Sequence, residues 1–262
     1  MHAEGPGQVA KHKEGRSRMK AQGNIHIGTS GWHYDHWKGP FYPEVMSAGE
    51  MLAFYADRLE TVEINNSFYQ LPEEKTLSEW RHTVPEGFVF AAKASRYITH
   101  MKKLKDPAKP VSTFVRRLEV LGDKLGPILY QLPPRWKLNL ERLRSFLHAL
   151  PVGHGYAFEF RDPSWFQNEV YEVLSDKNAA FCIYELAGQL SPKKVTADFV
   201  YVRLHGPGDA YEGDYDAQTL AGWAGAFSTW AGKGLQVYCY FDNDQSGYAV
   251  RNALSLRDML NG

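Results

Sequence analysis

The sequence predicts a single α/β domain, a (β/α)8 TIM-like barrel. Eight apolar runs of strand length alternate with helical segments between residues 25 and 260. Such alternation is typical of a parallel sheet, and eight βα units in roughly 250 residues match the size of one barrel. An open, doubly wound sheet is the alternative, although the chain contains no G-x-G-x-x-G or Walker sequence to favour it.

The first half of the chain carries four of the expected strands. They are short runs rich in β-branched, aromatic and alanine residues: Ile25–Ser30, Thr61–Asn65, Phe88–Ala94 and Pro127–Gln131. Helices are expected between them at Gly49–Arg58, Pro72–His82 and Val111–Leu121. The Pro-Glu-Glu start of the second helix and the glycine after the third, Gly122, are typical helix boundaries.

The second half repeats the rhythm. Its strands are expected at Tyr156–Arg161, Ala179–Tyr184, Phe199–His205 and Gln236–Asp242. Amphipathic helices are expected near 139–149, 167–176, 217–231 and 247–260, and only a weak helical signal follows the sixth strand.

Residues 1–23 precede this pattern. They carry five Lys or Arg against two Glu and no apolar periodicity, which predicts a flexible basic tail ahead of a barrel at 24–262. Met19 is an alternative start. No run of about 20 apolar residues and no signal-peptide pattern occurs, so we expect a cytoplasmic protein without membrane contact. The two cysteines lie in apolar runs and suit neither a disulfide framework nor a zinc site.

The strand faces indicate where the site lies. Side chains alternate along a strand, and in a barrel only the mouth end of the inner face can be polar. Glu159 and Arg161 share one face of the fifth strand, opposite three aromatic residues. Polar residues converge in the same way from other strand ends: Glu63, Asn65, Lys93, Gln131, Arg203, His205 and Asp242. A self-neutralising ion network is the bland interpretation, and a site for a charged or hydroxyl-rich ligand is the functional one.

Several stretches resemble a known family. They include Gly28–Trp32, Trp37–Pro43, Val62–Tyr69, Phe158–Arg161 with Ser164-Trp165, Arg203–Gly206 and Phe241–Asp244. In order and spacing the chain is similar to domain-of-unknown-function family 72 from about residue 24 to 260. The resemblance implies a TIM-like barrel of unsettled activity, similar in outline to endonuclease IV-type barrels, and fold analogy carries little functional weight.

Three chemical interpretations follow from the expected mouth. In the first, an acid–base hydrolase uses Glu63, Glu159, His205 and Asp242 on a small anionic or polyhydroxylated ligand. The ligand would be bound by side chains at or just after strand ends: Trp32, Asn65, Tyr69, Lys93, Gln131, Arg161, Trp165, Arg203 and Asn243. In the second, these cations and aromatics hold a nucleic acid as a binder or phosphodiesterase. In the third, the barrel is a non-catalytic binding or scaffold protein.

No cofactor is expected. Cations compete for the same carboxylates, and no metal-ligand spacing is present, so a resident metal is not predicted either. The sequence carries no signal about oligomeric state.

Overall fold

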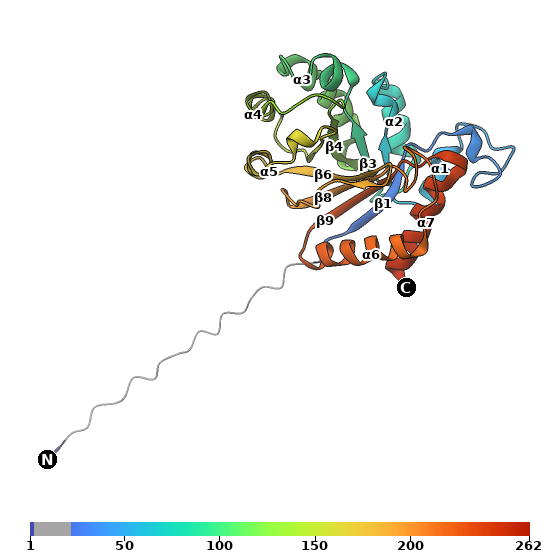
Figure 1. Cartoon of the computed structure of the whole chain (residues 1–262). Helices are drawn as coiled ribbons and strands as arrows, with labels where there is room; N and C mark the ends of the chain where they lie inside the picture. The colour runs from blue at the N-terminus through green and yellow to red at the C-terminus, as the bar shows by residue number, and fades with distance from the viewer. Residues whose placement is uncertain (3–21) are drawn as a thin grey trace.

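A computed structural model describes residues 1–2 and 22–262 of the chain. The expected tail at 1–23 therefore lies outside the described residues except at its two ends. Eight parallel strands form the central sheet, and the last pairs with the first (Figure 1). The barrel strands are β1 (Ile25–Ser30), β2 (Thr61–Ile64), β3 (Val89–Lys93), β4 (Leu125–Gln131), β5 (Tyr156–Glu159), β6 (Ala179–Leu186), β8 (Phe199–Leu204) and β9 (Gln236–Phe241).

Helices surround this sheet as predicted (Figure 1). They are α1 (Met51–Ala56), α2 (Glu74–Thr83), α3 (Ala108–Leu118), α4 (Leu140–His148), α5 (Asn168–Ser175), α6 (Ala217–Gly232) and α7 (Tyr248–Asn261). Shorter helical turns lie at Asp35–Trp37, Asn66–Phe68, Tyr97–Met101, Glu119–Lys124, Pro163–Trp165 and Gln245–Gly247. The third helix starts and ends three residues earlier than predicted, and Gly122, with a φ of 60°, interrupts the helical turn that follows it.

One βα unit differs from the pattern. Instead of a helix after β6, the chain turns at Ala187 and Gly188, both with positive φ, and β7 (Gln189–Leu190) pairs antiparallel with β6. Pro192 follows at once and disfavours a helix at this point. The weak helical signal in this stretch thus corresponds to a hairpin.

The two strand faces pack as the alternation predicts. Phe158 of β5 faces outward and contacts Phe146 of α4, with ring centroids 6.1 Å apart. The inner faces form a separate enclosed cluster that fills the barrel with small and large side chains: Ala91, Leu129, Ala157, Ala180, Cys182, Phe199, Tyr201 and Tyr240. Because this layer fills the interior, the polar residues that come next along each strand lie at the carboxyl end of the barrel.

Candidate functional site

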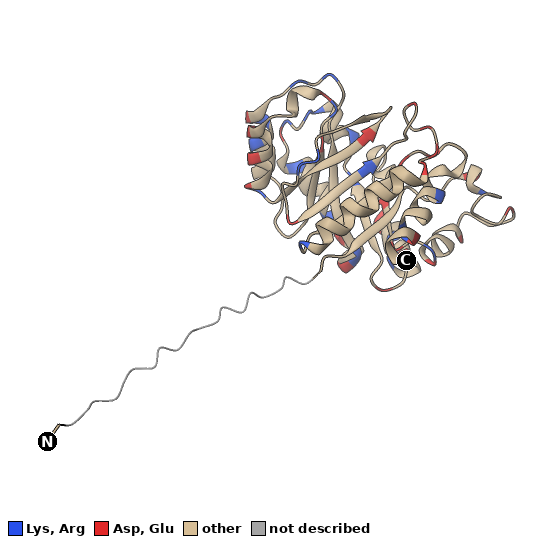
Figure 2. Cartoon of the chain, turned by 60° about the horizontal axis from the view of Figure 1, so that its bottom comes forward, with Lys and Arg blue, Asp and Glu red and all other residues tan. Residues whose placement is uncertain are grey.

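The inner faces bring the predicted polar residues together at the carboxyl ends of the strands. Figure 2 shows charged segments near the arrowheads of strands that are otherwise uncharged. Glu63 lies one residue before the end of β2, beside Ser30 of β1, and Glu159 ends β5 beside Gln131 of β4. Lys93 ends β3, and Arg203 lies one residue before the end of β8.

Arg203 is the centre of the cluster. Its guanidinium is fully enclosed and contacts one oxygen from each of three carboxylates: Glu63 at 2.7 Å, Glu159 at 2.9 Å and Asp242 at 3.0 Å. Ser30 Oγ accepts a further hydrogen bond from Arg203 Nη2 at 3.2 Å. Burial of an unpaired charge is costly, and Arg203 gives three buried acids a partner. These ion pairs link four strand ends and so help to keep the strands in register.

Arg161 lies beside this centre. Its Nε pairs with Glu159 Oε1, and its Nη2 is 3.0 Å from His205 Nε2. An arginine only donates, so this contact makes Nε2 an acceptor and assigns the ring proton to Nδ1. Nδ1 in turn donates to Asp242 Oδ2 at 3.0 Å. His205 is thereby held in a fixed orientation between an arginine and an acid.

Two carboxylates in this network, Glu159 and Asp242, are held ionised. Burial opposes ionisation of Glu159, but Arg161 and Arg203 outweigh it and hold the pKa of Glu159 well below its usual value. The pKa of Asp242 is lowered against the same opposing burial, mainly by Arg203. Glu63 and Glu159 are both 0% exposed. This geometry suits fixed charges better than the proton donor and acceptor roles expected for these two glutamates.

Lys93 differs from the two arginines. No carboxylate of the described chain lies within 4.0 Å of its Nζ, and Nζ donates no hydrogen bond to a described residue. The ammonium instead lies 4.6 Å from the centroid of the Phe68 ring, and the residue is 9% exposed. Burial, and then the charge of Arg203, lower the pKa of Lys93.

A second cationic feature is one that the sequence reasoning missed. The segment 93–109, from the end of β3 into α3, contains six Lys or Arg and one acid. The loop after β4 adds three more in residues 132–142, with one acid. Arg142 of α4 donates to the carbonyl of Lys103, so the two basic segments touch. His100 lies among these cations; burial, followed by the charges of Lys93, Arg96 and Arg161, lowers its pKa to about 4.

The opposite side of the mouth is acidic. Residues 205–216, which follow β8, contain four Asp or Glu and no Lys or Arg. The mouth is therefore positive over β3 and β4 and negative over β8. Such a separation of charge orients a polar ligand and attracts anions to one side.

The ligand contacts expected in the loops of the mouth fall into two groups, and the first group lines an open cavity. Trp32, Asn65 and Tyr69 lie together and line an open cavity of about 280 Å³ between the loops after β1 and β2. Tyr69 is 81% exposed and free to meet a ligand.

Two other expected ligand contacts are not supported. Trp165 is 0% exposed, stacks on Phe160 at 4.8 Å between ring centroids and donates to the Trp136 carbonyl. Asn243 is also 0% exposed, and its Nδ2 donates to Gly213 and Asn252. Both residues brace loops and do not face the mouth.

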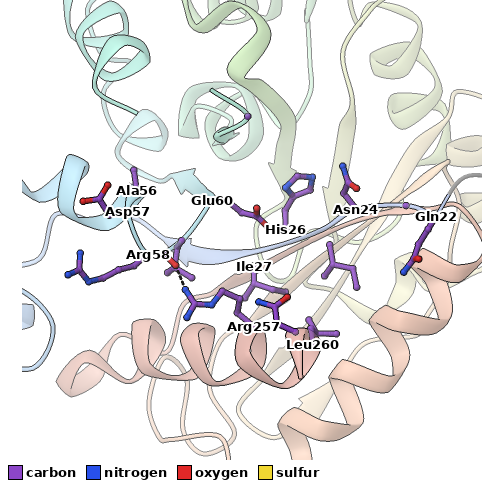
Figure 3. Close-up of a pocket in the computed structure, with 15 residues that line it drawn as sticks. Gln22, Asn24, His26, Ile27, Ala56, Asp57, Arg58, Glu60, Arg257 and Leu260 are labelled. Carbon is purple, nitrogen blue, oxygen red and sulfur yellow. Dashed lines mark hydrogen bonds between the residues drawn. The ribbon is translucent and has the colours of Figure 1, made fainter. Parts of the chain in front are cut away.

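A larger cavity of about 750 Å³ opens at the other end of the barrel (Figure 3). Its wall includes His26, Arg58, Glu60 and Arg257, and Arg257 donates to the Arg58 carbonyl. Barrel active sites are built at the carboxyl ends of the strands, whereas this cavity lies at their amino ends. It is therefore separate from the charged mouth.

Within residues 22–262, no three His, Cys, Asp or Glu side chains are arranged to hold a metal ion. Among the helices described, none is long and apolar enough to cross a membrane.

Comparison with known proteins extends these observations. A family model described as "Protein of unknown function DUF72" matches residues 26–262. The crystal structure of a DUF72 family protein from Thermotoga maritima superposes with a TM-score of 0.83 at 27% identity, covering 91% of this chain and all of that one. UPF0759 protein YunF of Bacillus subtilis is 25% identical over 90% of this chain and 94% of its own length. UPF0759 protein YecE of Escherichia coli is 29% identical over 54% of this chain, and that match spans half of its length.

Proposed function

Because the chain belongs to the DUF72 family, whose description names no activity, we propose its function from the mouth itself: the barrel binds a small anionic or polyhydroxylated ligand there. The ligand would contact the positive side of the mouth, over β3, β4 and β5. Aromatic and amide side chains of the cavity beside β1 and β2 would cover its uncharged part.

The observation that carries this proposal is the state of Lys93. Arg203 is matched by Glu63, Glu159 and Asp242, so its charge is largely compensated inside the protein. Lys93 has no such partner in the described chain and reaches the mouth beside a loop that is itself basic. A buried cation without a counterion is unfavourable unless a ligand supplies the negative charge.

The enclosed network has a supporting part in this proposal. The ion pair with Glu159 orients Arg161, and the hydrogen bond with Asp242 orients the His205 ring. Both side chains are therefore preorganised before a ligand binds. Preorganised donors bind an anion without the cost of reorientation. If turnover occurs, His205 is the proposed proton carrier, because its Nε2 has an unprotonated lone pair.

A melting-temperature panel tests the proposal. Phosphate, citrate and glucose 6-phosphate should each raise the melting temperature, because a ligand that binds the native state stabilises it, and glucose should do so less. The rise should vanish in Lys93→Met and persist in Lys233→Met, which removes an exposed lysine at the end of α6. Equal shifts in both variants would contradict the proposal.

A second candidate is a single-stranded nucleic acid, favoured by the basic segments 93–109 and 132–142. Exposed Tyr97 and Met101 accompany them, at 47% and 68% exposure, and aromatic faces stack unpaired bases. An oligonucleotide titration decides this: its affinity should fall steeply between low and moderate salt. Binding whose affinity does not depend on salt, or no binding at all, would exclude a nucleic acid and leave a small anion as the candidate ligand.

We also propose a cytoplasmic location, in keeping with Cys182 and Cys239, which are buried free thiols. Cell fractionation would test it, and recovery in an oxidising compartment would contradict it.

A further inference from the structure

Lys93 combines three structural features that an ordinary surface lysine lacks. It lies at the carboxyl end of an inner barrel strand, it is 9% exposed, and it faces an aromatic ring in place of an acid. Its backbone is fixed, because Ser67 Oγ donates to the Lys93 carbonyl at 2.6 Å. The side chain thus extends from a fixed point at the mouth and places its nitrogen near the Phe68 ring, with no acid of the described chain within 4.0 Å.

We infer that Lys93 is a nucleophile that forms an imine with the carbonyl carbon of an anionic oxo compound, such as a 2-oxo acid or a phosphorylated aldehyde sugar. This inference rests on the proposed anion site, which would hold the acid group of the same ligand. Arg161 is suited to that group, because it lies at the mouth, where its Nε pairs with Glu159 and its Nη2 is 3.0 Å from His205 Nε2. The carbonyl is then left for Lys93.

The step balances without any oxidant or further reactant. The Lys93 ammonium first loses one proton to solvent. Its nitrogen lone pair then adds to the carbonyl carbon, forming the C–N bond while the C=O π electrons move to oxygen. The oxygen gains a proton, the nitrogen loses one, and the resulting carbinolamine expels water as the C=N bond forms. One water molecule leaves for each imine.

The surroundings of the amine favour this chemistry. Lysines become nucleophiles when burial and a neighbouring cation destabilise the ammonium form. At Lys93, burial lowers the pKa first and Arg203 lowers it further, against the opposing charges of Asp242, Glu63 and Glu159. Arg203 thus has a second consequence: it neutralises the carboxylates that would otherwise stabilise a protonated Lys93.

Reductive trapping tests the inference on the full chain. The protein is incubated with pyruvate or glyceraldehyde 3-phosphate and cyanoborohydride, digested, and mapped by mass spectrometry. Lys93 should carry several-fold more of the reduced adduct than exposed lysines such as Lys233, because its lowered pKa leaves more of the amine unprotonated. Glyceraldehyde without phosphate is the matched probe and should label Lys93 less. Labelling of Lys93 no greater than that of Lys233 would overturn the inference.

A parallel measurement separates this inference from the proposed function. If phosphate raises the melting temperature and Arg161→Met abolishes the rise, but Lys93 stays unlabelled, the anion site stands and the imine is wrong. If Lys93 is labelled equally by both aldehydes and phosphate does not compete, the nucleophile stands and the anion site is wrong. Selective labelling that phosphate suppresses supports both.

Discussion

Replacing Arg203 with methionine removes the shared cation of the mouth, and the structure indicates what remains. Glu159 keeps Arg161, and Asp242 keeps the hydrogen bond from His205. Glu63 keeps hydrogen bonds from Ser30 and Tyr201, each 2.6 Å, but loses its ion pair. One enclosed carboxylate is thus left without a counterion.

Breaking a buried ion pair by removing one partner costs about 3–5 kcal/mol. We expect Arg203→Met to lose that much unfolding free energy near neutral pH, a fall of roughly 6–20 °C in melting temperature for a domain of this size. Arg116→Met is the matched control, because Arg116 is exposed on α3 and pairs with no acid of the described chain; it should change stability by no more than about 0.5 kcal/mol.

The pH dependence of the unfolding free energy is a second test of the prediction for Arg203→Met. In the native protein the pKa values of Glu159 and Asp242 are held below their usual values, so their contribution is complete above the unfolded pKa and is lost as the pH falls through the folded one. Arg203→Met removes much of that contribution, so its deficit should shrink on acidification. Urea unfolding at about pH 7 and about pH 4 measures both values. A variant within about 1 kcal/mol of the native protein at neutral pH would refute the reasoning.

Three further outcomes are expected. Trp165→Ala should destabilise the fold by about 3–5 kcal/mol in urea unfolding, because this ring lies in the core. Phosphate should still raise the melting temperature of the variant, and loss of phosphate binding in a folded variant would contradict a purely structural role for Trp165. Glu159→Gln should weaken phosphate binding measured by calorimetry, since it releases Arg161; unchanged affinity would contradict the supporting role. His100 should titrate with a pKa of about 4 by NMR, because burial and then the neighbouring cations oppose its protonation, and a value near 6.5 would contradict this placement. Because that folded pKa is lowered, stability should fall on acidification from about pH 6.5 through 4 less in His100→Gln than in the native chain.

The strand faces were predictable because one face of each strand meets helices and must be apolar. That rule places Glu63, Lys93, Glu159 and Arg203 inward and at the same end, and the structure confirms it. The alternation of side chains along a strand does not predict which charges pair. Pairing depends on the stagger of strands across the barrel, so Arg203 reaching three acids while Lys93 reaches none had no signal in the sequence.

The basic loops left a signal that the overall composition hid. A net charge of zero averages segment 93–109 against the acidic stretch 205–216. A running count of charge along the chain would have separated them. Trp165 and Asn243 were misplaced for a different reason: they follow strand ends closely, but each packs against the loop of the preceding barrel strand, where an indole and an amide satisfy backbone carbonyls.

Calorimetric titration of glucose 6-phosphate into the native chain, Arg161→Met and Lys233→Met decides whether an anion binds at the mouth. Arg161 lies at the mouth beside His205, whereas Lys233 lies at the far end of α6. We expect saturable binding to the native chain and to Lys233→Met, and affinity at least about tenfold weaker in Arg161→Met, the loss expected for one charged hydrogen bond. Equal affinity in all three proteins would contradict an anion site at the carboxyl ends of the strands.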